Sequence, residues 1–239
     1  MQCLILAGGM GTRMQSLAPD LPKTLIPVNG RPFADYQLSW LRSEGVHRVV
    51  YAIGHLGEAV RAFCGDGSHW GLEIVYADEG DARLGTAGAV NFAVREGLLE
   101  DGFFVLYGDS FLRIDMKDVW RASQAGARPL MSVFRNEGRW DASNAMVRNG
   151  YVTHYEKDRA DAQAMGMDHI DYGLSVLNTE TIVANVGISE VADLAPLFHR
   201  LSLDGRLRAY AATERFYEVG SPEGLADLEA YLSRSGEGS

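Results

Sequence analysis

Residues 3–13 read CLILAGGMGTR, an apolar segment followed at once by a glycine-rich turn. The apolar part has the length of one buried strand. The three glycines leave the backbone N–H groups unobstructed by Cβ atoms, so these groups can point inward and bind an anion such as a triphosphate. We therefore predict a strand that ends in a phosphate-binding loop. The residues expected in this loop are Ala7, Gly8, Gly9, Gly11, Thr12 and Arg13.

Two better-known phosphate-binding patterns do not fit this loop. The dinucleotide-binding pattern GxGxxG, counted from Gly9, requires a glycine where the chain has Met14. The pattern GxxxxGK followed by Ser or Thr does not occur in the sequence. The segment therefore indicates a phosphate loop of another class.

Up to about residue 130, short apolar runs alternate with segments of helical periodicity. Alternation of this kind is typical of parallel strands joined by crossover helices. The predicted strands are 49–53, 72–76 and 103–107, and the predicted helices are 33–41, 56–63 and 85–97. The strand at 103–107 is apolar throughout, as expected of a strand that is buried on both faces.

Beyond residue 130 the strand-like segments outnumber the helical ones, which indicates a small antiparallel addition to the parallel part. The predicted strands are 130–134, 145–147, 151–155 and 172–177, and the predicted helices are 191–201 and 225–232. A polar stretch at 157–169 is expected to be a loop. We predict one α/β domain over residues 1–239.

The chain has 239 residues and a formal net charge of −10. That charge argues against a general affinity for nucleic acid or for an anionic membrane. Without an apolar run of about 18 residues, or the charged start and long apolar stretch of a signal peptide, the sequence predicts a cytoplasmic protein. Cys3 and Cys64 cannot build a disulfide framework or a four-ligand zinc site and are predicted to be structural.

An anionic substrate must then be held by a local basic pocket, and the first 31 residues supply one. Their charges are Arg13, Lys23 and Arg31 against Asp20, a net of +2. Lys23 lies in the segment LPKTLIPV, between two prolines that stiffen the backbone. The start of the chain is therefore the predicted site of the anion.

The segments GGMGTR and PKTLIPV together resemble the first signature of the sugar-1-phosphate nucleotidyltransferases. Enzymes of this family join a nucleoside triphosphate to a sugar 1-phosphate and release pyrophosphate. The resemblance implies a Rossmann-like, three-layer α/β/α fold with a mostly parallel central sheet. It also assigns Arg13 and Lys23 to the triphosphate.

A second matching motif is LGTAG at residues 84–88. The resemblance implies that small residues at the start of a helix allow close approach of base and sugar there. Gly85 and Thr86 are accordingly expected to contact the nucleotide, and Gly88 the sugar. Glu79 is expected near the base, beside the glycine-rich loop.

Two acidic residues match the metal ligands of the family. Asp109, in LYGDS, lies just after the apolar strand, at the edge where ligands of parallel sheets bind. Glu218, in FYEVGSPE, stands where the closing motif of the family has an aspartate. The resemblance implies that both hold a Mg²⁺ ion. From the residues alone, Asp109 could instead serve a turn and Glu218 the N-terminus of the following helix.

The resemblance also places a sugar-binding set in the second half of the chain. Glu156 and Lys157 match a Glu-Lys motif whose glutamate contacts sugar hydroxyls and whose lysine contacts the sugar phosphate. Asn144 and Gly173, the latter in the segment Asp-Tyr-Gly, fall where the family has further sugar contacts. On its own a Glu-Lys pair is common on protein surfaces.

The six histidines, at positions 47, 55, 69, 154, 169 and 199, show no HxxxH or HxH spacing. Such spacings are the usual sequence sign of a metal site on one helix or strand. The histidines are therefore predicted to be surface groups or supports for other residues.

The expected chemistry is phosphoryl transfer without a nucleophilic side chain. Mg²⁺ on Asp109 and Glu218 is expected to bridge the phosphates, and Lys157 is expected to orient the attacking sugar phosphate. Arg13 and Lys23 neutralise the departing pyrophosphate in this scheme. These three basic residues are the predicted catalytic residues.

Within the family the chain resembles the heptose 1-phosphate guanylyltransferases and the N-acetylmuramate 1-phosphate uridylyltransferases, which favours GTP over UTP only weakly. A choline-phosphate cytidylyltransferase and a nucleotide-binding regulatory homologue remain alternative interpretations of the sequence. A glycosyltransferase is disfavoured because no DxD motif follows a strand. The partners expected are a nucleoside triphosphate and a sugar 1-phosphate, with no nucleic acid or membrane. The sequence leaves base, sugar and any homo-oligomer undecided.

Overall fold

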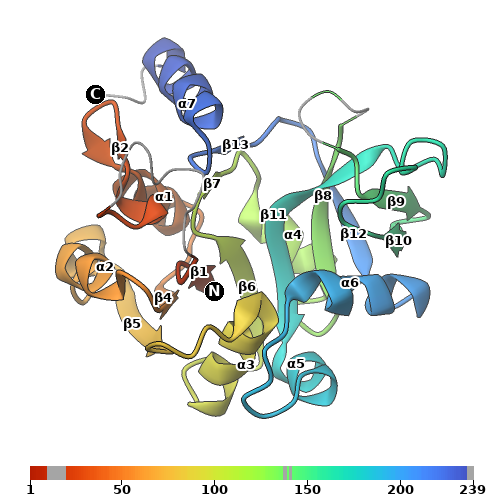
Figure 1. Cartoon of the computed structure of the whole chain (residues 1–239), viewed down its shortest axis with the longest axis horizontal. Helices are drawn as coiled ribbons and strands as arrows, with labels where there is room; N and C mark the ends of the chain where they lie inside the picture. Colours follow the sequence, from red (N-terminus) through yellow and green to blue (C-terminus); the bar gives the residue numbers. More distant parts are fainter. Residues whose placement is uncertain (10–19, 137–138, 140–141, 236–239) are drawn as a thin grey trace. The chain divides into compact units, whose positions relative to one another are not determined.

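The computed structural model describes residues 1–9, 20–136, 139 and 142–235 (Figure 1). The chain divides into two units. Unit 1 comprises residues 1–83, 106–112 and 216–239, and unit 2 comprises residues 84–105 and 113–215. The single domain expected over residues 1–239 stays a prediction.

Three parallel strands in the order β5-β4-β1 form the sheet of unit 1. They are β1 (Gln2–Leu6), β4 (Arg48–Ile53) and β5 (Glu73–Asp78). The first two are buried along nearly their whole length, as expected of parallel strands covered by crossover helices. The connecting segments contain α1 (Phe33–Ser43), α2 (Gly57–Cys64) and the short helix η3 (Ser68–Trp70). These strands and the two longer helices confirm the predicted alternation.

Between β1 and α1 the chain forms a short helix and a hairpin. The helix is η2 (Lys23–Leu25), and the hairpin joins β2 (Pro27–Val28) to β3 (Arg31–Pro32). Asn29 and Gly30 make the turn with φ angles of 47° and 82°. Both angles are positive, which the Asn-Gly pair tolerates best in a two-residue hairpin.

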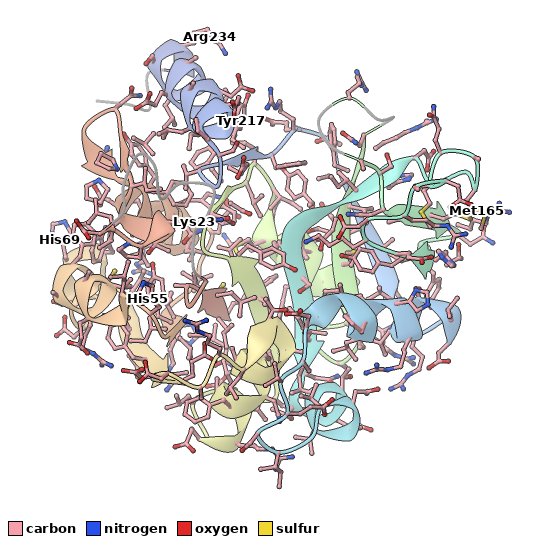
Figure 2. The ribbon with its side chains drawn as sticks, in the orientation of Figure 1. Lys23, His55, His69, Met165, Tyr217 and Arg234 are labelled. Atoms are coloured by element: carbon pink, nitrogen blue, oxygen red, sulfur yellow. The ribbon has the colours of Figure 1, made fainter. Side chains whose placement is uncertain are left out.

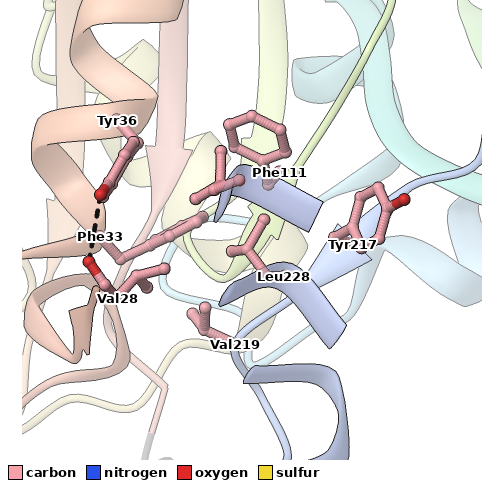
Figure 3. Packing of buried hydrophobic residues seen from close by; sticks show 8 residues of the cluster. Val28, Phe33, Tyr36, Phe111, Tyr217, Val219 and Leu228 are labelled. Atoms are coloured by element: carbon pink, nitrogen blue, oxygen red, sulfur yellow. Dashed lines mark hydrogen bonds between the residues drawn. The ribbon is translucent and has the colours of Figure 1, made fainter. Parts of the chain in front are cut away.

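A hydrophobic cluster fixes the end of the chain to this hairpin and to α1. β13 (Tyr217–Glu218) pairs antiparallel with β7 (Ser110–Phe111), and α7 (Pro222–Ser235) follows. The side chains of Phe33, Phe111, Val219 and Leu228 point toward one another in Figure 3 and are buried. Burial of this apolar surface holds β13 beside β7 and so sets where the residues next to them lie.

In unit 2 five strands follow the order β11-β8-β12-β10-β9. β8 and β12 are parallel, and the other pairs are antiparallel. The strands are β8 (Leu130–Arg135), β9 (Ala145–Arg148), β10 (Tyr151–Tyr155), β11 (His169–Asn178) and β12 (Arg208–Ala212). The change from parallel to antiparallel pairing after residue 130 agrees with the sequence. β6 (Gly102–Tyr107) carries the chain from unit 2 into unit 1.

The helices of unit 2 are α3 (Gly85–Arg95), α4 (Met116–Ala122), α5 (Thr179–Asn185) and α6 (Leu194–Leu203). α4 and α5 were not predicted, because seven residues make only about two turns and show little periodicity. Side chains of Asp115 and Asn178 cap their N-termini instead. β12 was also missed, since its sequence RAYAA has no β-branched residue.

The helix predicted over 191–201 begins later than expected. Val191 lies before α6 and is 71% exposed. The segment leading to α6 is held in place because the N–H group of Ala192 donates to the carbonyl of Leu84, at 2.9 Å. That contact fixes the chain outside the helix until Leu194.

Cys3 and Cys64 are buried, free thiols, in agreement with a structural role. Burial raises the pKa of both, to about 11 for Cys64, which keeps the thiols protonated at neutral pH. Within the described part of the chain, every helix is too short or too polar to cross a membrane.

Candidate functional site

Three charged side chains of unit 1 converge beside Gly220. A Cβ atom built on Gly220 would lie 2.9 Å from Asp109 Oδ2 and 3.1 Å from Lys23 Nζ, and it would overlap Glu218 Oε2. A second glycine, Gly224 at the start of α7, is equally close to the Glu218 carboxylate. A side chain at either position would require the Glu218 carboxylate to shift, so glycine lets the two carboxylates and the ammonium group lie where they do.

Lys23 reaches this point from η2 (Figure 2). The carbonyl of Pro22, whose backbone is extended, accepts from the N–H group of Leu25 at 2.8 Å and so closes the short helix. Lys23 Nζ then lies 2.8 Å from Asp109 Oδ2, with side chains 22% and 25% exposed. The ion pair is accessible to water and to small solutes.

Asp109 follows the C-terminal end of β6, as the sequence predicts. The N–H group of Gly108 donates to the carbonyl of Leu6 at 3.0 Å, and a Cβ atom on Gly108 would lie 2.6 Å from that same oxygen. Close approach of the two strand ends therefore requires glycine before the aspartate. The buried Gln37 of α1 donates to the carbonyls of Tyr107 and Ser110, at 3.2 and 3.0 Å, and so fixes both sides of the turn.

Glu218 is placed by the pairing of β13 with β7. It lies opposite Ser110 in that ladder, and the N–H group of Val219 donates to the carbonyl of Asp109 at 2.9 Å. The carboxylate accepts from the N–H group of Gly220 and from the hydroxyl of Ser221, each at 2.6 Å. These donors hold both carboxylate oxygens in one orientation.

The glycine-rich loop is described as far as Gly9. The N–H group of Ala7 continues the β1 ladder by donating to the carbonyl of Ala52 at 2.9 Å. A Cβ atom on Gly8 would lie 3.0 Å from Glu79 Oε1, so the absence of a side chain lets the loop approach this glutamate. Glu79 thus borders the loop that the sequence assigns to the nucleotide. Gly11, Thr12 and Arg13 lie outside the described residues.

Gly85, Thr86 and Gly88 occur at the start of α3 in unit 2, where they pack against the segment before α6. Cβ atoms on the two glycines would lie 2.6 Å from the carbonyl oxygen of Ala192 and 2.7 Å from that of Glu190. The hydroxyl of Thr86 donates to Asp193 Oδ1 and accepts from the N–H group of Leu194, at 3.2 and 2.8 Å. Contacts within unit 2 therefore account for these small residues, independently of any ligand.

Part of the predicted sugar-binding set meets around Asp171. Asn144 Oδ1 accepts from the N–H group of Asp171 at 2.9 Å, and Asp171 Oδ1 accepts from that of Gly173 at 3.0 Å. Gly173 has a φ of 96°, a conformation that favours glycine. Burial raises the pKa of Asp171 to about 6, while the Gly173 N–H group and the charge of Lys157 lower it. Asn144, Lys157 and Gly173 are thereby linked through one aspartate.

Glu156 is engaged with its own neighbours. Its Oε2 atom lies 3.1 Å from His154 Nε2 and accepts from Arg159 at 2.5 Å. Both partners hold the pKa of Glu156 below its usual range, so the carboxylate is ionised at neutral pH. The lysine that follows it, Lys157, is exposed.

Comparisons with known proteins identify the family of the chain. A family model described as Nucleotidyl transferase matches residues 2–163. The chain belongs to this family.

The chain is similar to curated proteins of several bacteria. It is 34% identical over 116 residues to the D-glycero-alpha-D-manno-heptose 1-phosphate guanylyltransferase of Campylobacter jejuni, a match covering 48% of this chain and 51% of the relative. It is 29% identical over 243 residues to the mannose-1-phosphate guanylyltransferase of Mycobacterium tuberculosis, which covers 94% and 64%. The match to the Campylobacter protein thus spans about half the length of that relative.

Solved structures confirm the fold of the chain. HddC from Yersinia pseudotuberculosis superposes with a TM-score of 0.80 at 22% identity, covering 97% of this chain and 99% of that one. A putative glucose-1-phosphate thymidylyltransferase from Bacillus anthracis gives a TM-score of 0.81 at 17% identity, with coverages of 97% and 94%. The α/β nucleotidyltransferase fold expected from the sequence is therefore correct.

The structure adds residues that the sequence analysis did not select. Gln37 fixes the turn of Asp109 from a helix 70 positions earlier than Tyr107, and no local motif signals it. Gly220 was recognised only as part of the closing motif, and Gly224 was not selected. The reason for glycine at both positions is the close approach of the Glu218 carboxylate, which only the structure reveals. Asp171 lies two positions before Gly173, which the sequence analysis selected. The burial of Asp171 appears only in the structure.

Proposed function

We propose that the chain transfers a nucleotidyl group from a nucleoside triphosphate to a sugar 1-phosphate and releases pyrophosphate. The observation that carries this proposal is the convergence of Lys23, Asp109 and Glu218 beside Gly220. Membership of the nucleotidyl transferase family supports the reaction type. The names of the Campylobacter jejuni and Mycobacterium tuberculosis relatives support the substrate class.

The proposed step is one displacement at phosphorus. A phosphate oxygen of the sugar 1-phosphate attacks the α-phosphorus and forms the new P–O bond, while the bond from that phosphorus to the bridging oxygen breaks. The electron pair of that bond leaves with pyrophosphate. Since no proton must move, the obstacle is repulsion and misalignment between two anions, and catalysis requires cations and positioning.

The residues around Gly220 fit a Mg²⁺ ion. Asp109 and Glu218 offer carboxylate oxygens, the ligands that Mg²⁺ prefers, and the missing Cβ of Gly220 leaves space beside them. When bound, Mg²⁺ would offset the negative charge of the phosphate oxygens. Lys23, the cation that contacts Asp109 here, would then exchange this carboxylate for an oxygen of the triphosphate.

Other residues have proposed roles in binding. Backbone groups of the loop from Ala7 to Gly9 would hold the triphosphate, with Gly11, Thr12 and Arg13 continuing that loop, and Glu79 would border the base. In unit 2, Lys157 would orient the sugar phosphate. The proposed sugar contacts are Gly88, Asn144, Glu156 and Gly173. Gly85 and Thr86 stay assigned to the nucleotide, beside their contacts within unit 2.

We further propose GTP as the nucleotide and a heptose 1-phosphate as the acceptor. Two curated relatives support this choice: the Campylobacter jejuni protein, and its namesake from Aneurinibacillus thermoaerophilus, which is 31% identical over 120 residues. The Yersinia pseudotuberculosis HddC structure has also been solved with GMP-PN. A product of this reaction is a GDP-sugar, the kind of donor used to build cell-surface polysaccharides.

The experiment that tests the proposal measures pyrophosphate release with Mg²⁺. Each of the four nucleoside triphosphates is combined with heptose, mannose, glucose and N-acetylmuramate 1-phosphates, and choline phosphate is included with CTP. We expect the highest kcat/KM for GTP with a heptose 1-phosphate. Faster turnover of another pair would change the assigned substrate, and no turnover of any pair would refute the reaction.

Matched variants test the site. Glu218→Gln and Asp109→Asn remove one negative charge each with little change of shape, and we expect each to lower kcat about 100-fold or more. Glu223→Gln makes the same change at an exposed position of α7 and should leave kcat within about twofold. Equal losses in Glu218→Gln and Glu223→Gln would contradict a specific role for Glu218.

A further inference from the structure

His154, Glu156 and His199 form a group of potential metal ligands in unit 2. One ligand atom from each residue lies within 4.8 Å of the others, and all three residues are partly buried. Among the described residues this is the one group of three or more His, Cys, Asp and Glu side chains that is so arranged. No spacing in the sequence indicates this group, because the two histidines are 45 positions apart and lie on different elements.

Packing of α6 against β10 brings the group together (Figure 1). The ring of Tyr155 on β10 meets that of Phe198 on α6 edge-on at 6.0 Å, and the N–H group of Tyr155 donates to Ser202 Oγ at 3.1 Å. His154 and His199 flank these anchoring residues in the sequence. Their own rings lie 5.4 Å apart and perpendicular to one another.

A bulge in β10 helps to aim His154. The register with β9 shifts between Val152 and His154, so that one residue of β10 has no direct partner there. Bulges of this kind turn a strand locally and often occur beside functional sites. Glu156, just after the strand, is fixed through its backbone N–H group, which donates to the carbonyl of Asn144 at 2.9 Å.

The hydrogen bonds of His199 favour metal binding. His199 Nδ1 lies 2.6 Å from the carbonyl oxygen of Tyr155. Because a carbonyl can only accept, Nδ1 must carry the proton, and the lone pair of the neutral ring is then on Nε2. A ring nitrogen that donates to a backbone carbonyl while the other nitrogen binds metal is the usual arrangement of a metal-bound histidine.

The donor set points to zinc. Two imidazole nitrogens and one carboxylate oxygen suit Zn²⁺, whereas Mg²⁺ prefers oxygen ligands alone. In a tetrahedral zinc site the ligand atoms are roughly 3.4 Å apart, given bonds of about 2.1 Å. The observed spacing of up to 4.8 Å requires only side-chain rotations to reach that value. A fourth position would be left for water.

Arg159 is the cation that contacts the carboxylate in this structure. Its guanidinium donates to Glu156 Oε2 at 2.5 Å and also to Asp161 Oδ1 at 2.6 Å. Asp161 gives Arg159 a second partner, so the guanidinium can release Glu156 without losing its charge compensation. Arg159 should therefore compete with a metal ion for Oε2.

We propose that His154, Glu156 and His199 bind a Zn²⁺ ion that ties β10 to α6. Glu156 would give Oε2 to the zinc and keep Oε1 for its proposed contact with sugar hydroxyls. The inference stands on contacts within unit 2 and does not depend on the proposed reaction. It can be tested in experiments that contain no substrate.

The test is a zinc titration of the full chain, freed of metal and of any histidine tag, in competition with a chromophoric chelator. We expect about one Zn²⁺ per chain and a rise in Tm of roughly 5 °C at saturation, which His154→Ala should abolish. His154→Ala and His199→Ala should weaken zinc binding at least about 100-fold. His55→Ala, which removes an exposed histidine, should bind as the unchanged chain does.

Several outcomes would overturn the proposal. They are equal zinc affinity in the unchanged chain and in either cluster variant, an equal Tm rise from Zn²⁺ in the unchanged chain and in His154→Ala, and loss of binding in His55→Ala. If the alanine variants fail to fold, Co²⁺ on the unchanged chain replaces them: a visible spectrum of nitrogen-bound Co²⁺ that one equivalent of Zn²⁺ abolishes supports the site, and its absence refutes it.

Arg159→Gln tests the carboxylate ligand separately. Removing the competing guanidinium should tighten zinc binding several-fold, because Oε2 no longer has to leave an ion pair. Glu156→Gln should weaken binding by about tenfold or more. Affinity that stays the same in both variants would remove Glu156 from the site and, with it, the proposed set of three ligands.

Discussion

Units 1 and 2 place their polar side chains by different means. In unit 1, Asp109 follows β6 and Glu218 ends β13, and glycines at 108, 220 and 224 remove side chains that would crowd the carboxylates, beside the hydrogen bonds that also orient them. In unit 2, Asn144 and His199 hydrogen-bond residues on other elements, and Glu156 contacts its near neighbours His154 and Arg159. The site in unit 1 therefore depends on steric fit as well as on hydrogen bonds, whereas the polar groups of unit 2 depend on pairing. Substitutions should damage the two in different ways.

The largest effect is expected from Gly220→Ala. The new methyl group would overlap Glu218 Oε2 and crowd Asp109 and Lys23, so the carboxylates must separate. Misplacement of about 1 Å in a phosphoryl-transfer site lowers kcat/KM roughly 100-fold. Steady-state kinetics of pyrophosphate release measure this. Since Gly220 has no positive φ, the backbone itself tolerates alanine. Full activity in Gly220→Ala would contradict steric control of the site.

A smaller effect is expected from Gln37→Leu, which removes both hydrogen bonds around the turn of Asp109. Two buried carbonyls lose their donor, which should cost about 1–3 kcal/mol of unfolding free energy. Urea denaturation measures the change, and Gln163→Leu at an exposed position serves as the control. Unchanged stability would show that water replaces the amide, and the turn would then not depend on Gln37.

Thr86→Val tests whether the hydroxyl of Thr86 serves the hydrogen bond to α6 or the binding of the nucleotide. Loss of the hydroxyl leaves the N–H group of Leu194, at the start of α6, without its acceptor and should cost about 1 kcal/mol. Thr86→Ser keeps the hydroxyl and should restore stability. Thermal denaturation of both variants, with KM for the nucleotide, provides the test. A raised KM with unchanged stability would indicate that Thr86 serves the nucleotide and not α6.

The two units also differ in how much the sequence could predict. Asp109 and Lys23 were selected because each lies in a short motif next to a strand or between prolines, where local geometry decides their position. The sequence spacing of His154 and His199 does not indicate a shared site, because only the packing of α6 on β10 brings the two residues together. α4 and α5 were missed for a related reason: their ends are set by single capping side chains, and not by a repeating pattern.

The LGTAG segment shows the limit of motif reasoning. The sequence correctly predicts a helix that starts at Gly85, and the resemblance assigns its small residues to base and sugar. The structure gives Gly85 and Gly88 a second reason to be small, since carbonyls of residues 190 and 192 approach them within 2.7 Å of a would-be Cβ. A motif of small residues indicates that a larger side chain does not fit at that position. It does not identify the neighbour that occupies the space.

The effect most specific to unit 2 is expected from Asp171→Asn. The pKa of Asp171 is about 6 in the folded chain against an ordinary value of 3.8. Between these pH values the folded chain keeps a proton that the unfolded chain has released, so stability from this residue falls as pH rises and stays low above about pH 6. Asparagine cannot ionise and keeps Oδ1 for the N–H group of Gly173.

The Tm of Asp171→Asn should therefore match that of the unchanged chain near pH 4 and exceed it increasingly up to neutral pH. Thermal denaturation in a series of buffers of constant ionic strength measures the difference. The opposite sign at pH 7, a lower Tm in the variant, would mean that attraction between Asp171 and Lys157 outweighs the cost of burying the charge. Charge pairing in unit 2 would then be strong enough to resist desolvation, and the contrast with the steric site of unit 1 would become sharper.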